Sequence, residues 1–170
     1  MTDPKEKIEQ EAQAYRDGSE QPLGGYAAVV AGYTALVAAG VLAARATGRR
    51  GVAANVGPWD LALMGLTTHK FSRLLAKDPV TSPLRALFTR YRGVSGPSEL
   101  EEEVRDESGR RAVGELITCP FCTAQWVATG YVFGLAFAPG LTRAAGAVFS
   151  AVAVSDWLQL GYARLQQVQE

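Results

Sequence analysis

Residues 23–44 read LGGYAAVVAGYTALVAAGVLAA and contain no charged side chain. A helix of about 20 mostly apolar residues is long enough to cross the hydrocarbon core of a bilayer. Three basic residues, Arg45, Arg49 and Arg50, follow this stretch at once. The stretch therefore predicts a membrane-spanning helix that ends at a polar interface.

Two further stretches have the same character. Residues 116–138 are uncharged, and residues 144–163 are interrupted only by Asp156. If three such runs were buried in a soluble bundle, a chain of 170 residues would have too little polar sequence to cover its surface. Residues 59–77 form a weaker fourth candidate, because the basic side chains in their second half would have to extend to one interface along their aliphatic stems.

The basic residues do not decide between four crossings and three, because both arrangements place 13 Lys and Arg on one side and four on the other. We expect four, since Asp60 and the three arginines after residue 44 then share the outer interface. The sequence thus predicts an all-α fold, a polytopic transmembrane bundle of four spans (or three plus a partial one). The excess of basic residues on one side predicts a bacterial inner membrane protein with both termini in the cytoplasm.

The polar segments of the sequence indicate how the chain is divided into an N-terminal helix and a transmembrane domain. Residues 1–22 are expected to form a cytoplasmic amphipathic helix that starts at Asp3-Pro4, because Pro is favoured at the first helical position. Residues 23–170 then form a single transmembrane helical domain. Its polar segment, residues 78–114, is expected to lie in the cytoplasm.

Two short helices are predicted in this polar segment. Ser82-Pro83 predicts the start of a basic amphipathic helix that lies along the lipid headgroups. Ser98 and Glu101 have the spacing of a capping box, which predicts an acidic helix from Glu99 to Glu107.

Several motifs together resemble a family of bacterial and phage proteins catalogued as domain of unknown function 1360, which includes a sporulation-associated protein of bacilli. They are a basic stretch from Thr67 to Asp78, the turn Val80-Thr81-Ser82-Pro83-Leu84-Arg85, and Cys119-Pro120-Phe121-Cys122 followed by Trp126. The resemblance covers roughly residues 59–165. It implies a membrane fold and no particular activity.

Cys119 and Cys122 have the spacing of a glutaredoxin-like redox pair, and a helix start beside the first thiol would lower its pKa. Two thiolates at this spacing also suit zinc, for which His69 is the only histidine that could serve as a third ligand. Asp78, Asp156 or a second subunit would have to complete such a set. A third alternative is that the two side chains only pack at the start of a helix.

Charged residues near the same interface are candidates for contacts with lipid or with one another. Arg73, Lys77 and Arg85 are basic residues suited to an anionic headgroup or phosphate. Asp78 adjoins this cluster. Asp156, inside a predicted span, should have an ionic partner among the basic residues of the weaker span.

The predicted function is non-enzymatic: a membrane accessory or assembly protein whose cytoplasmic face binds anionic lipid or a protein partner. The alternative is a membrane thiol-redox or metal-binding protein that uses the two cysteines. Small residues at every fourth position, such as Ala31, Ala35 and Ala39, favour a homo-oligomer or a membrane protein partner. The balance of 17 basic and 17 acidic residues argues against nucleic acid.

Overall fold

The computed structural model describes residues 3–19, 21–49, 56–105 and 109–169. Within these ranges the chain forms helices and one two-stranded antiparallel sheet. The elements are α1 (Pro4–Arg16), α2 (Leu23–Ala46), α3 (Pro58–Lys77), the 3-10 turn η2 (Pro79–Thr81), α4 (Ser82–Arg85), β1 (Thr89–Gly96), β2 (Glu99–Val104), α5 (Arg111–Thr118), α6 (Pro120–Phe137) and α7 (Pro139–Gln169).

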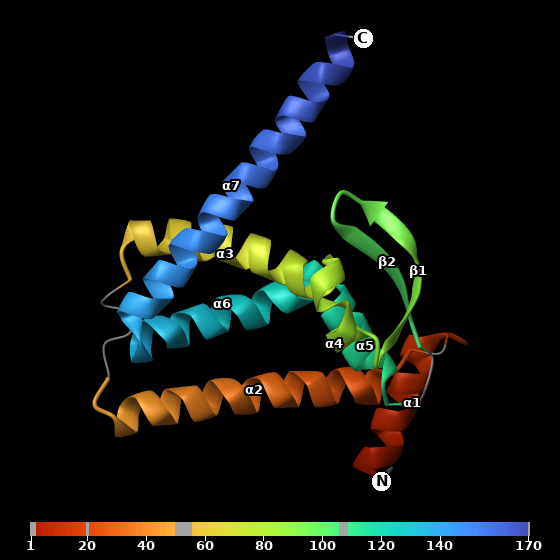
Figure 1. Ribbon diagram of the computed structural model, residues 1–170. Helices are drawn as coiled ribbons and strands as arrows, with labels where there is room; N and C mark the ends of the chain where they lie inside the picture. Colours follow the sequence, from red (N-terminus) through yellow and green to blue (C-terminus); the bar gives the residue numbers. More distant parts are fainter. Residues whose placement is uncertain (1–2, 20, 50–55, 106–108, 170) are drawn as a thin grey trace.

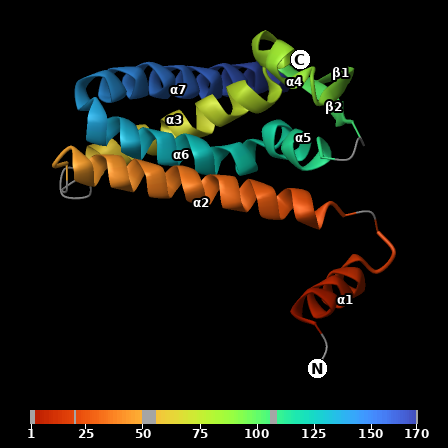
Figure 2. The same cartoon turned by 90° about the horizontal axis from the view of Figure 1, so that it is seen from below.

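Four long helices form the body of the molecule. α2, α6 and α3 lie side by side, and α7 packs across α3, with its C-terminal half extending away from the other helices (Figures 1 and 2). The C-terminal ends of α2 and α6 and the N-terminal ends of α3 and α7 lie at the same end of the bundle (Figure 1). The sheet and α5 lie at the opposite end of the bundle, which we call the hairpin end (Figure 2).

Polar groups join the helices. The Thr67 hydroxyl on α3 donates to the Gly146 carbonyl on α7 at 3.1 Å, and the Ser150 hydroxyl donates to the Leu63 carbonyl at 3.3 Å. The Arg143 guanidinium donates to both carboxylate oxygens of buried Asp60, at 2.8 and 3.0 Å. Small residues and hydrogen bonds of this kind are typical of helix contacts inside membranes.

The predicted helices are present, with one interruption. α2, α3 and α7 correspond to the expected stretches. The run predicted from residue 116 to residue 138 is broken at Cys119, whose extended backbone (φ −99°, ψ 109°) separates α5 from α6. Pro120 causes the break, because a proline disfavours helical backbone in the residue before it.

Two helices of the described ranges have the length and composition needed to cross a membrane, α2 and the span Pro139–Val168 of α7. α3 contains Asp60, Lys70, Arg73 and Lys77 in addition to its apolar residues. Four crossings therefore remain a prediction.

The expectation of an all-α fold is wrong in the polar segment. The predicted acidic helix starting at Glu99 is strand β2, which pairs with β1 in an antiparallel hairpin. Ser98 has a positive φ of 57° and belongs to the turn between the strands instead of capping a helix. Residues 106–108 of the predicted helix lie outside the described residues.

The predicted amphipathic helix after Ser82 is also wrong, since α4 ends at Arg85 and β1 begins at Thr89. The hairpin forms because a basic strand lies opposite an acidic one. Arg90 faces Glu103 in the register, and the Arg92 guanidinium bonds to Glu103. Opposite charges across an antiparallel pair stabilise it.

The N-terminal helix begins as expected, at Asp3-Pro4. The Asp3 carboxylate accepts the Lys5 N–H at 3.1 Å, which caps the start of α1. Asp17 and Gly18 adopt positive φ angles at its end. No residue of α1 is buried, and the helix stands apart from the bundle next to the N-terminal end of α2 (Figure 2).

Candidate functional site

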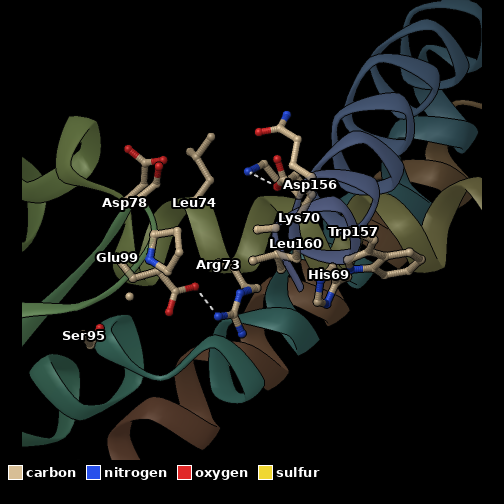
Figure 3. A pocket seen from close by; sticks show the side chains of 15 residues that line it. His69, Lys70, Arg73, Leu74, Asp78, Ser95, Glu99, Asp156, Trp157 and Leu160 are labelled. Carbon is tan, nitrogen blue, oxygen red and sulfur yellow. Dashed lines mark hydrogen bonds and ion pairs between the residues drawn. The ribbon is translucent and has the colours of Figure 1, made fainter. Parts of the chain in front are cut away.

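A cavity of about 710 Å³ opens at the hairpin end of the bundle. Its walls come from three elements: α3, the C-terminal half of α7, and the turn of the hairpin (Figure 3). Volumes of this size are typical of sites for small ligands, about 300–1,000 Å³. The residues that carry its charge and shape are His69, Lys70, Arg73, Glu99, Asp156 and Trp157.

Two ion pairs lie in the cavity wall. Lys70 Nζ on α3 is 2.6 Å from Asp156 Oδ2 on α7. Arg73, about one helical turn further along α3, pairs with Glu99 at the start of β2. In Figure 3 the Lys70–Asp156 pair lies above the α3 ribbon and the Arg73–Glu99 pair lies below it. The cavity wall therefore contains two ion pairs, Lys70–Asp156 and Arg73–Glu99.

An aromatic contact borders these pairs. The rings of His69 and Trp157 lie 5.4 Å apart between their centroids. Leu74 and Leu160 add apolar surface to the same cavity (Figure 3). Asp78, at the C-terminal cap of α3, also lines the cavity, and its carboxylate accepts the Val80 N–H at 2.9 Å.

Arg85 has a different position from the other candidate cations. Its side chain is only 1% exposed, and its guanidinium pairs with Glu102 on β2. The same group donates to the carbonyl oxygens of Leu75 and Asp78 and to the hydroxyl of Thr81, at 2.6–3.0 Å. Carbonyl groups at the end of a helix need such partners, so this arginine caps α3 and fastens the hairpin to it. We call these five residues the Arg85 cluster.

The two cysteines lie where α5 meets α6. Cys119 caps α6, and its sulfur accepts the N–H of Cys122 at 3.3 Å. Both thiols are free, with Cys119 half-buried and Cys122 exposed. The neighbouring Phe121 side chain is 89% exposed. This is the helix-start geometry that the spacing predicts for a reactive first thiol.

The surroundings of Cys119 favour its thiolate form. Burial raises the pKa of this thiol, but hydrogen bonds from the Cys122 side chain and from the N–H groups of Cys122 and Phe121 lower it. The positive charge of Lys77, at the end of α3, lowers it further. The net result is a pKa below the ordinary value for cysteine.

The structure does not bring His69 to the cysteines, since His69 packs against Trp157 at the cavity. No three His, Cys, Asp or Glu side chains within the described ranges are arranged to hold a metal ion. A zinc site at Cys119 and Cys122 therefore stays a prediction that requires ligands from a second chain.

Sequence reasoning missed the acidic half of this region. The sequence places Glu99 and Glu102 in a predicted acidic helix, yet they pair with Arg73 and Arg85. The Gly96-Pro97-Ser98 turn between a basic run and an acidic run was the signal for a hairpin.

The family can be assigned once this geometry is clear. The family model described as "Protein of unknown function (DUF1360)" matches residues 63–162, from α3 to α7. The chain belongs to this family. The match includes the charged residues of the cavity, the Arg85 cluster and both cysteines, and it leaves out α1 and α2. The resemblance seen in the sequence is confirmed.

One curated relative is sporulation protein YjcA of Bacillus subtilis (strain 168). It is 31% identical over 71 residues, which is 40% of this chain and 60% of that protein. The chain thus matches about 60% of the length of this relative. No solved structure matches the chain.

Proposed function

We propose that this DUF1360 protein is a non-enzymatic accessory protein of the bacterial inner membrane. Its α2, α3, α6 and α7 cross the bilayer, and its hairpin end binds anionic lipid in the cytoplasm. The observation that carries the proposal is the distribution of side chains, which differs from that of a soluble protein with an apolar core. The buried residues of the described ranges include seven apolar and seven polar or charged ones, while large apolar side chains are exposed along the helices. Extensive exposed apolar surface marks contact with a membrane or a partner.

The lengths of the four helices support four crossings. α2, α3, α6 and α7 contain 24, 20, 18 and 31 residues. A crossing requires about 17–25 residues, and more when the helix is tilted. Two charged residues of α3 form ion pairs with residues of α7: Asp60 with Arg143, and Lys70 with Asp156. Such pairing lowers the cost of charge within a bilayer.

The surface of the hairpin end suits a lipid interface. Arg90 is exposed at this end, and Arg164 is exposed on α7 directly after Ala163 of the cavity lining. Each cation near an anionic membrane surface contributes about 1 kcal/mol of attraction. Exposed apolar side chains accompany them, with Val80, Leu84 and Leu87 between 66% and 85% exposed. The apolar groups would enter the interface while the arginines contact headgroups. In this proposal η2, α4 and the residues before β1 would take the place of the amphipathic helix that was predicted after Ser82.

The test is the amount of phosphatidylglycerol retained per chain after purification in mild detergent, measured by native mass spectrometry. An Arg90→Gln, Arg164→Gln double variant should retain about thirtyfold less, from roughly 1 kcal/mol for each of the two cations lost. The matched control is Arg45→Gln, which removes an exposed cation at the opposite end of α2. Equal retention by the double variant and the control would refute the lipid role.

A homo-oligomer or a membrane protein partner is part of this proposal. The small residues Ala27, Ala31, Ala35, Ala39 and Ala43 of α2 are all exposed in the single chain. They offer a surface on which another helix can approach closely. Cross-linking of a chain with Ala35→Cys into a dimer would support self-association, and a monomer in a mild detergent would argue against it.

The second candidate function is thiol-redox or metal chemistry at Cys119 and Cys122. The capping position of Cys119 and its lowered pKa favour the thiol version. The metal content of protein purified without chelators distinguishes a metal site from thiol-redox chemistry. Stoichiometric zinc lost in Cys119→Ser would support a metal site. Metal-free protein that exchanges with a model disulfide, and ceases to do so in Cys119→Ser, would support thiol chemistry.

A further inference from the structure

The cavity at the hairpin end holds two ion pairs in its walls, while a further carboxylate, Asp78, accepts the backbone N–H of Val80. Lys70 and Arg73 on α3 supply two cations, and each is paired with a carboxylate of another element, Asp156 on α7 and Glu99 on β2 (Figure 3). A ligand that bears only negative charge would draw the cations away and leave both carboxylates without a partner. Leaving a partly desolvated charge unpaired is costly.

These ion pairs are open to exchange with a ligand. The side chains of Lys70 and Asp156 are 19% and 42% exposed, and those of Arg73 and Glu99 are 42% and 24% exposed. The Arg85–Glu102 pair, by contrast, is almost fully buried and bound to several backbone groups. The cavity pairs can therefore open towards an entering headgroup while the Arg85 cluster keeps the hairpin attached to α3.

We propose that this cavity binds the headgroup of a zwitterionic phospholipid with a primary amine, of the phosphatidylethanolamine class. The phosphate binds Arg73 and Lys70, and the ammonium group binds Glu99 and Asp156. All four protein charges then keep an opposite partner. This inference rests on the proposed membrane location, and it adds a selective site to the general attraction for anionic lipid.

The apolar part of the cavity fits the rest of such a lipid. Leu74 and Leu160 border the charged groups, and Trp157 lies beside them at a position where tryptophan is typical of a membrane interface. These side chains can contact the glycerol and the first methylene groups of the lipid chains. A free soluble phosphoethanolamine would leave this surface unused.

The experiment uses Trp157 fluorescence in a full-length chain with Trp59→Phe and Trp126→Phe, held in detergent micelles. Short-chain phosphatidylethanolamine should change the emission in a saturable manner. Phosphatidylglycerol, which lacks the amine, and phosphatidylcholine, whose amine cannot donate hydrogen bonds, should bind at least about tenfold more weakly. Soluble phosphoethanolamine should compete weakly; if it bound as tightly as the lipid, the membrane lipid would be the wrong ligand.

Variants assign the effect to the cavity. Glu99→Gln should weaken phosphatidylethanolamine binding at least about tenfold, as one charged hydrogen bond is lost. Asp156→Asn on the other wall should do the same. Glu103→Gln, on the same strand but in the exposed pair with Arg92, should leave binding unchanged.

Equal binding of the three lipids, or no effect of Glu99→Gln and Asp156→Asn, would overturn the proposed site. Retention of phosphatidylglycerol through Arg90 and Arg164 would be unaffected by that outcome. The selective site and the general lipid contact can thus fail separately.

Discussion

Two neighbouring glutamates of β2 provide a matched test of what holds the hairpin to the bundle. Glu102 pairs with Arg85, and their side chains are 6% and 1% exposed. Glu103 pairs with Arg92, and those side chains are 53% and 55% exposed. The same substitution, Glu→Ala, therefore removes a buried partner at one position and an exposed partner at the next.

The expected magnitudes differ because of burial. Removing one partner of a buried ion pair costs about 3–5 kcal/mol, since the remaining charge is left uncompensated. Arg85 keeps three other acceptors, so we expect the lower end, about 3 kcal/mol, for Glu102→Ala. An exposed pair contributes about 0–1 kcal/mol, which sets the limit for Glu103→Ala.

The assay is amide hydrogen exchange of residues 89–104 in detergent micelles, which reports local opening of the hairpin. A cost of 3 kcal/mol corresponds to roughly hundredfold faster exchange in Glu102→Ala. Glu103→Ala should accelerate exchange at most about fivefold. An Arg85→Met, Glu102→Leu double variant should recover part of the protection, because no buried charge remains unpaired. Equal acceleration in the two single variants would refute the assigned role of the Arg85 cluster.

Two further predictions concern packing and thiol reactivity. Gly146→Ala should lower the free energy of unfolding by about 1–3 kcal/mol, because the added Cβ would lie 2.3 Å from the Tyr131 hydroxyl oxygen. The control Gly130→Ala, whose added Cβ meets open space, should leave the thermal unfolding midpoint unchanged. Equal midpoints for the two variants would contradict the packing of α6 against α7. The rate of alkylation of Cys119, measured as a function of pH, should have a lower midpoint in the folded chain than in denatured protein. The reason is that folding lowers the pKa of this thiol, so the thiolate persists to lower pH. Lys77→Gln should raise this midpoint, and an unchanged midpoint in both comparisons would show that the helix start does not activate the thiol.

The long helices could be predicted because their signal is local. An uncharged run such as residues 23–44 needs no knowledge of the rest of the chain to be recognised as a helix of membrane length. The partner of Asp156 was expected among the basic residues of α3, and Lys70 occupies that position. Helical spacing and the cost of an unpaired charge were sufficient for that prediction.

The hairpin could not be predicted in the same way, because its stability comes from pairs distant in sequence. Glu102 alternates with exposed neighbours on β2, but its burial depends on Arg85, which is 17 positions away. Read locally, the glutamates after Ser98 favour a capped helix. The cavity was missed for the same reason, since it exists only when the hairpin turn meets α3 and α7.

The account depends most directly on whether α3 crosses the membrane. Single cysteines in a chain with Cys119→Ser and Cys122→Ser can be tested with a membrane-impermeant maleimide on intact cells. Four crossings predict labelling of Thr47→Cys and Leu141→Cys from outside. Gln13→Cys and Ser98→Cys should react only after the membrane is opened. Labelling of Gln13→Cys on intact cells, together with protection of Thr47→Cys, would contradict the account and show that α3 does not cross.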